Sequence, residues 1–201
     1  IENLPNSQFY RLEWNHHNPG QYTGGAQDNG TSTGSYLGLN SWNRDRGGDG
    51  FTPVFHPTNP NYRIATVQWA SFAYSYDSPT SSNPSWNGMA DTDAGDRKGW
   101  DAPIMLHPAN PEHIWTGTQR MWKMIGAPSG TWTAMSGDLT LNIDPALSYR
   151  IITSITGSPI DENIVAAGTA DGQVHYTADG GTTWNLMTSG LPERYVTDLY
   201  F

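Results

Sequence analysis

Asn110-Pro-Glu-His-Ile-Trp-Thr-Gly-Thr-Gln119 is one of three copies of a ten-residue frame that opens with Asn-Pro and closes with Gln. The other two copies are Asn18-Pro-Gly-Gln-Tyr-Thr-Gly-Gly-Ala-Gln27 and Asn59-Pro-Asn-Tyr-Arg-Ile-Ala-Thr-Val-Gln68, and a divergent fourth copy is Asp161-Glu-Asn-Ile-Val-Ala-Ala-Gly-Thr-Ala170. Successive copies begin 41, 51 and 51 residues apart. Units of roughly 40 to 50 residues that each hold several short β-like runs have the period of a β-propeller blade.

The residues around each frame predict four strands per unit. A short apolar run precedes the frame, and two further strand-like runs follow it, the last one led by a tryptophan at Trp86, Trp132 or Trp184. Asn-Pro favours a turn because proline fixes φ and has no N–H to donate to a ladder. We therefore expect an all-β chain of four-stranded antiparallel blades, with strands A to D in chain order and the Asn-Pro turn between A and B. A two-sheet sandwich would have similar strand content but would not need an in-register repeat.

The repeat also predicts the organisation of the chain. Residues 1–201 are expected to form a single β-propeller with about four blades, as part of a larger ring. The blades are expected at about 9–50, 51–101, 102–149 and 150–193, with 194–201 as the first strand of a further blade. The alternative is a closed ring of four blades in which this last strand completes the first blade.

Composition excludes several classes of function. The net charge is −9, and no Lys/Arg cluster is present to neutralise phosphates, so a nucleic-acid partner is not expected. No apolar stretch is long enough to predict a transmembrane segment. The absence of cysteine rules out a disulfide framework but leaves the redox compartment open. The first residue is not Met and no signal peptide is recognisable, so we expect a mature or truncated chain whose remainder belongs to a larger parent.

A second motif adds a family resemblance. Thr177-Ala-Asp-Gly-Gly-Thr-Thr-Trp184 matches the S/T-x-D-x-G-x-T-W turn known as the Asp-box. With Tyr22-Thr-Gly-Gly-Ala-Gln-Asp-Asn-Gly-Thr31 and Gly47-Gly-Asp-Gly50, it makes nearly the whole chain resemble the BNR-repeat, Asp-box β-propellers, which include sortilin-like (VPS10-type) proteins and xyloglucanase-like glycoside hydrolases. Only the fourth blade has an intact box.

The resemblance has two implications. In this family the box is structural, which assigns Thr177, Asp179, Gly181 and Trp184 to a turn and not to catalysis. The two glycine-rich motifs are similar to those of secreted Bacteroidetes-type members, which implies an extracellular or cell-surface location.

Strand direction predicts which loops can bind a ligand. Because consecutive strands are antiparallel, the A–B and C–D turns share one face of the blades, and the B–C turns and D–A connections share the opposite face. The D–A connections are long and chemically mixed, and such loops on a rigid scaffold often carry binding groups. Carboxylates, arginines and aromatic rings together suit a glycan or a protein ligand. The candidate ligand-binding residues are Gln27, Asp28, Asn29, Arg44, Asp49, Trp69, Trp100, Arg120 and Trp122.

Two functions are compatible with this face. The first is a secreted or cell-surface binding module for a protein or a glycan. The alternative is a glycoside hydrolase of the Asp-box propeller type, for which Asp28 and Asp49 are the candidate acids. Such enzymes need two carboxylates about 5 Å apart for retention or roughly 6.5 to 9.5 Å apart for inversion. Both acids also lie in ordinary turn sequences, and a facing pair of acids in a cleft would separate the two functions.

Metal binding has one candidate. Asp91, Asp93 and Asp96 surround a glycine at the short spacing of a calcium loop, although a solvated acidic loop explains them equally. No other cofactor is expected. His56 and His107 occupy equivalent repeat positions, which predicts support of the A–B turn and not a zinc site.

Overall fold

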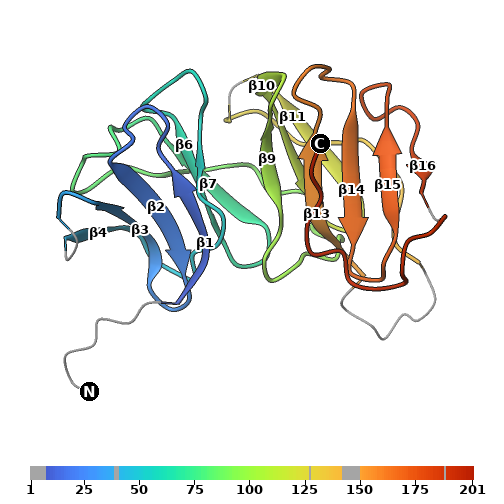
Figure 1. The fold of residues 1–201 in the computed structure, drawn as a ribbon, viewed down its shortest axis with the longest axis horizontal. Helices are drawn as coiled ribbons and strands as arrows, with labels where there is room; N and C mark the ends of the chain where they lie inside the picture. Colours follow the sequence, from blue (N-terminus) through green and yellow to red (C-terminus); the bar gives the residue numbers. More distant parts are fainter. Residues whose placement is uncertain (1–7, 39–40, 127, 142–149, 188) are drawn as a thin grey trace. The chain divides into compact units, whose positions relative to one another are not determined.

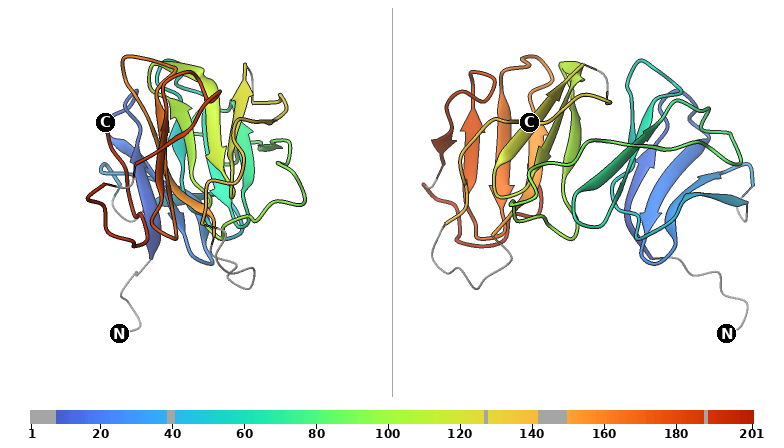
Figure 2. Two further views of the ribbon diagram at one scale, coloured as in Figure 1. Left: turned by 90° about the vertical axis from the view of Figure 1, so that its right-hand side faces the viewer. Right: turned by 180° about the vertical axis from the view of Figure 1, so that it is seen from behind.

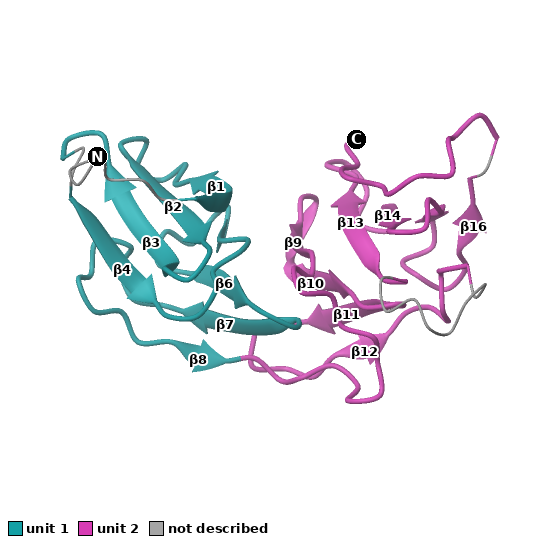
Figure 3. Ribbon diagram, turned by 90° about the horizontal axis from the view of Figure 1, so that it is seen from below, with its two compact units in different colours: residues 1–88 teal, residues 89–201 magenta. Residues whose placement is uncertain are grey.

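The computed structural model describes residues 8–38, 41–126, 128–141, 150–187 and 189–201. These residues form sixteen strands in four sheets, each of four antiparallel strands (Figure 1). The expected all-β fold with four-stranded blades is confirmed. The chain divides into two compact units, residues 1–88 and 89–201 (Figure 3). Among the described residues, no helix is long and apolar enough to cross a membrane.

Unit 1 contains two sheets whose strands pair in chain order. The first consists of β1 (Phe9–Trp14), β2 (Gln21–Ala26), β3 (Gly30–Ser35) and β4 (Trp42–Arg46). The second consists of β5 (Val54–Phe55), β6 (Arg63–Val67), β7 (Ser71–Ser75) and β8 (Asn87–Gly88).

Unit 2 has the same pattern, seen from behind in Figure 2. Its first sheet consists of β9 (Ile104–His107), β10 (Asn110–Gly117), β11 (Met121–Ile125) and β12 (Thr133–Ala134). Its second sheet consists of β13 (Ile152–Gly157), β14 (Val165–Thr169), β15 (Val174–Thr177) and β16 (Asn185–Leu186). The two sheets share one core, formed by Trp115, Met121, Leu139, Ile152, Val165 and Ala167.

The A–B turns are stabilised by one side chain at the end of strand A, as the repeat predicts. The ring Nδ1 of His56 accepts the backbone N–H groups of Thr58 and Asn59 at 3.2 and 3.1 Å. His107 accepts the N–H of Ala109 at 3.2 Å, and the Ser158 hydroxyl takes the same place in the fourth sheet. These side chains satisfy donors that a turn leaves unpaired.

The tryptophan that leads strand D makes a second recurring bond. The indole N–H of Trp86 donates to the Asp45 carbonyl at 2.9 Å, that of Trp132 to the Ala90 carbonyl at 2.9 Å, and that of Trp184 to the Met135 carbonyl at 2.8 Å. Each acceptor lies three or four residues after the corresponding tryptophan of the preceding repeat. Trp132 is buried, whereas Trp184 is half-buried and packs against the core of unit 2. Trp42, the equivalent residue of the first sheet, is 38% exposed and packs beside the rings of Phe9 and Tyr22.

Where each D–A connection leads into the next strand A, the chain passes the end of the preceding strand B in a repeated way. The backbone N–H of Gly50 donates to the Ala26 carbonyl, that of Ile152 to the Thr118 carbonyl, and that of Val196 to the Thr169 carbonyl. Residues 194–201, expected as the first strand of a further blade, contain no strand, although Val196 makes this connection contact (Figure 1). Residues 142–149 of the third connection lie outside the described residues.

Candidate functional site

The B–C turn of the second sheet presents an exposed tryptophan on a strained backbone. The N–H of Ser71 donates to the Gln68 carbonyl at 3.3 Å, and the two central residues, Trp69 and Ala70, have φ of 61° and 56°. Positive φ at both central positions is the pattern of a type I′ hairpin turn, which normally holds Asn-Gly. A bulky residue there costs about 1–3 kcal/mol. Trp69 nevertheless occupies the first position and is 57% exposed.

One carboxylate holds this turn and its neighbour together. Asp49 accepts the backbone N–H of Asp28 at 2.5 Å through Oδ1 and the side-chain amide of Gln68 at 2.6 Å through Oδ2. Asp49 is 7% exposed. The backbone comes this close because Gly50 has no side chain: a Cβ there would lie 2.3 Å from the Gly30 carbonyl oxygen. Asp49 thus bridges the B–C turns of both sheets of unit 1.

Unit 2 repeats this contact with different surroundings. Asp96, in the connection before β9, accepts the Gln119 amide at 2.8 Å, the Thr118 hydroxyl at 2.6 Å and the indole N–H of Trp122 at 2.8 Å. The guanidinium of Arg120 also donates to both oxygens of Asp96. Burial favours the neutral acid, but these hydrogen bonds, that from Arg120 foremost, outweigh it and hold the pKa of Asp96 below its ordinary value. Asp96 is therefore a fixed anion.

Trp122 is not the exposed aromatic platform for a ligand that we expected. It is 7% exposed, its indole N–H is bonded inside the unit, and Arg120 covers its ring at 4.8 Å. The side chain of Arg120 is itself 27% exposed and paired with Asp93 and Asp96. Trp100 remains accessible at 41% exposure.

The first B–C turn places Gln27, Asp28 and Asn29 at the surface. All three are exposed, Asp28 has φ of 60°, and the Asn29 amide donates to the Gln27 carbonyl at 3.0 Å. Arg44 is exposed on β4. Asp28 and Asp49 meet through the backbone N–H of Asp28 and the carboxylate of Asp49, and both Asp49 oxygens accept hydrogen bonds.

The three acids of the proposed calcium loop each have a partner. Asp91 pairs with Lys98 at 2.7 Å and Asp93 with Arg120 at 3.0 Å, while Asp96 is bound as described above. In the described part of the chain, no group of three acidic or histidine side chains is arranged to hold a metal ion.

The Asp-box forms a closed turn after β15. Asp179 accepts the Thr183 hydroxyl at 2.6 Å and the Thr183 N–H at 2.9 Å, and the Thr177 hydroxyl donates to it at 2.8 Å. Thr177 in turn accepts the N–H of Gly181 at 2.9 Å. The hydrogen bonds from Thr183 lower the pKa of Asp179 to about 2. Every hydrogen bond that Asp179 accepts among the described residues comes from a residue of the same turn.

Sequence reasoning missed two groups of residues. Gln68 and Gln119 close the repeated frames, and this repetition was the available signal for their bond to a carboxylate. The buried Asp45–Arg63 ion pair, at 2.8 Å, gave no signal because its members lie in different repeats. Burial raises the pKa of Asp45 in spite of hydrogen bonds from Thr33 and Arg63.

Known proteins share the fold of this chain, but the likeness does not show its function. No family model matches the chain, and no curated protein matches its sequence. Among solved structures, it is similar to a GH74 enzyme of Niastella koreensis, with a TM-score of 0.65 and 16% identity over 88% of this chain and 29% of that one. It is also similar to an ancestral GH74 enzyme, with a TM-score of 0.70 and 17% identity over 96% of this chain and 27% of that one. The chain thus has a β-propeller fold and spans less than a third of the length of these enzymes, which fits a fragment of a larger propeller.

Proposed function

We propose that this chain is a glycan-binding β-propeller module located outside the cell or at its surface. Its ligand lies on the face of unit 1 that carries the B–C turns and the D–A connections, and Trp69 is the aromatic platform. The C–H face of a sugar ring stacks on an indole, and the hydroxyl groups bond to neighbouring polar side chains. Gln27, Asp28 and Asn29 supply such groups on the other turn that Asp49 holds.

The observation that carries the proposal is the position of Trp69. An exposed tryptophan in a left-handed turn conformation costs backbone energy and gains little burial. The surrounding structure holds it there through the Asp49–Gln68 bond, which fixes the residue before it. Strain that is kept at an exposed position, and supported by a buried carboxylate, is typical of a binding site.

Glycoside hydrolysis is the second candidate, favoured by the two GH74 enzymes of similar fold. Catalysis would require one acid able to hold a proton and a second carboxylate across the substrate. Asp49 is committed to Asp28 and Gln68, so the described residues of unit 1 support binding better than cleavage. A protein ligand is the other partner that the exposed turns suit.

Affinity electrophoresis in native gels containing soluble xyloglucan tests the proposal. The wild-type chain should be retarded, and Trp69→Ala should weaken retardation by about tenfold, or ~1.4 kcal/mol. Trp14→Ala is the matched control, because Trp14 is equally exposed, at 60%, but lies at the opposite end of its sheet. Equal retardation of the two variants, or none of the wild type, would contradict the proposal. Release of reducing ends that Asp28→Asn abolishes, with folding intact, would establish the hydrolase instead.

A further inference from the structure

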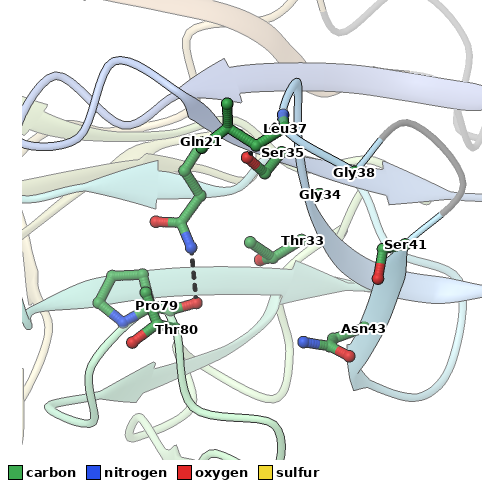
Figure 4. A pocket seen from close by; sticks show the side chains of 10 residues that line it. All are labelled: Gln21, Thr33, Gly34, Ser35, Leu37, Gly38, Ser41, Asn43, Pro79 and Thr80. Atoms are coloured by element: carbon green, nitrogen blue, oxygen red, sulfur yellow. Dashed lines mark hydrogen bonds between the residues drawn. The ribbon is translucent and has the colours of Figure 1, made fainter.

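A groove of mixed polar and apolar lining lies at the other end of the sheets of unit 1. It has a volume of about 300 Å³ and is lined by the start of β2, the end of β3, the start of β4 and the segment before β8. Pro79 and Thr80 stand on one side of it, and Ser41 and Asn43 on the other (Figure 4). Strand β2 separates this groove from the turn of Gln27 by roughly 17 Å, at about 3.3 Å per residue.

The side chains that line the groove are uncharged, and many of them carry a hydroxyl or an amide group. Hydroxyl groups come from Thr33, Ser35, Ser41 and Thr80, and amides from Gln21 and Asn43. None of the ten lining residues carries a charge. Leu37, Pro79 and the carbon atoms of the other lining residues provide the apolar part of the surface. Such a lining disfavours an ion or a lipid tail, and it matches a ligand that offers many neutral donors and acceptors beside a few C–H groups.

The groove is rigid on its inner side and available on its outer side. Gln21 is held at both ends of its amide, since it accepts from Asn15 at 2.7 Å and donates to the Pro79 carbonyl at 2.9 Å, as the dashed line in Figure 4 shows. Thr33 is buried and donates to Asp45 at 2.5 Å. Ser41 and Asn43 are exposed, and within the described residues neither side chain makes a hydrogen bond. Among the described residues, a ligand bound to these two groups would break no side-chain hydrogen bond.

We infer that this groove binds a single neutral sugar ring, as a site separate from the surface around Trp69. A pyranose presents hydroxyl groups around its edge and C–H groups on its faces, which match Ser41, Asn43 and Thr80 on the rim and Leu37 at the wall. A neutral peptide of this size would need pockets for apolar side chains, and the groove offers only Leu37 and Pro79. The inference does not depend on the proposed function, because the two sites use opposite ends of the sheets.

Titration of the isotope-labelled chain with methyl β-D-glucopyranoside, followed by amide chemical shifts, tests the inference. A small ligand of this kind binds in the range of about 1 mM, so the titration extends to about 50 mM. Saturable shifts should be confined to the groove, and Asn43→Ala and Thr80→Val should each raise Kd by about fivefold. Asn61→Ala is the control, since Asn61 is also exposed in unit 1 but does not line the groove.

The possible outcomes separate this site from the one at Trp69. Shifts that persist in Trp69→Ala support the groove even if xyloglucan retardation fails. Shifts that are not saturable, that lie at Trp69 instead, or that both groove variants leave unchanged overturn the inference. If a variant unfolds by circular dichroism, the location of the wild-type shifts alone decides.

Discussion

The side-chain amide of Gln68 donates to the carboxylate of Asp49 at 2.6 Å, and Gln119 makes the same bond to Asp96 at 2.8 Å. In both cases the glutamine closes a repeated frame and the acid lies in the connection that follows the preceding strand D. The fourth repeat has Ala170 in place of glutamine, and there Asp171 of the turn accepts the N–H of Leu141 at 2.7 Å. A hydrogen bond between the B–C turn and the D–A connection is thus kept in the fourth repeat, but here the acid lies in the turn and the donor lies in the connection.

Loss of this bond should destabilise unit 1. Gln68→Ala leaves one oxygen of the buried Asp49 without its donor, which should cost about 1–3 kcal/mol in the free energy of unfolding. The urea midpoint of unfolding, compared with that of the wild type, measures this loss. Gln27→Ala is the control, since Gln27 occupies the same repeat position and is exposed, and its effect should stay within about 0.5 kcal/mol. Equal effects of the two substitutions would contradict the role given to Asp49.

The strained turn predicts a substitution that stabilises the protein and impairs binding. Trp69→Asn places a residue suited to positive φ at an exposed position, so the free energy of unfolding should rise by about 0.5–1 kcal/mol while xyloglucan retardation is lost. Thermal unfolding and affinity electrophoresis of the same preparation measure both effects. A variant that is less stable than the wild type would show that Trp69 contributes to the fold itself.

The tryptophans of strand D should differ in their contribution to stability. Trp132→Ala removes a buried ring and should cost about 3–5 kcal/mol, whereas Trp184→Ala should cost less because Trp184 is only half-buried. Trp132→Phe keeps much of the packing but leaves the Ala90 carbonyl without the indole donor, at about 1 kcal/mol. Chemical denaturation ranks the three variants. A larger loss for Trp184→Ala than for Trp132→Ala would refute the ranking.

Unit 2 should lose stability in mild acid. Burial lowers the pKa values of His107, His113 and His175 in the folded chain, with a further contribution from Lys123 at the first two. The unfolded chain therefore takes up protons first, and the free energy of unfolding falls as pH decreases below about 6.5. Denaturation of the chain at several values between about pH 7.5 and 5.5 measures the slope. His107→Asn should reduce it, and substitution of the exposed His16 in unit 1 should leave it unchanged.

The Asp-box turn should respond to acid in a lower range. Because the folded pKa of Asp179 is about 2, the turn keeps its stabilisation above the ordinary pKa of an aspartate and loses it as pH falls toward about 2. Asp179→Ala should speed hydrogen exchange at the amides of Gly181 and Thr183 without affecting xyloglucan retardation. Loss of retardation in this variant would mean that the box takes part in binding.

The sequence predicted the parts of the molecule that repeat. Frames in register, Asn-Pro turns and tryptophan-led runs determine the strands, because each repeat must bury the same faces and satisfy the same turn donors. The exposure of Trp69 and the burial of Trp122 could not be predicted in this way. Trp69 lies within its B–C turn, directly after Gln68, whereas Trp122 lies on β11, three residues after Gln119. Arg120 and Asp96 cover Trp122. Such cover arises from connections of unequal length and composition, where the repeat gives no constraint.

The indole bonds of strand D make the repeat array polar along the chain. Each tryptophan donates backward, to a carbonyl of the repeat before it. Within this set of bonds, shortening from the C-terminal side leaves a carbonyl without its indole donor, and water satisfies such a carbonyl readily. Shortening from the N-terminal side instead removes the backbone carbonyl that accepts the indole N–H of the next tryptophan. Removal of a repeat from the N-terminal side thus leaves an indole N–H without its acceptor, a defect that removal of the last repeat does not create.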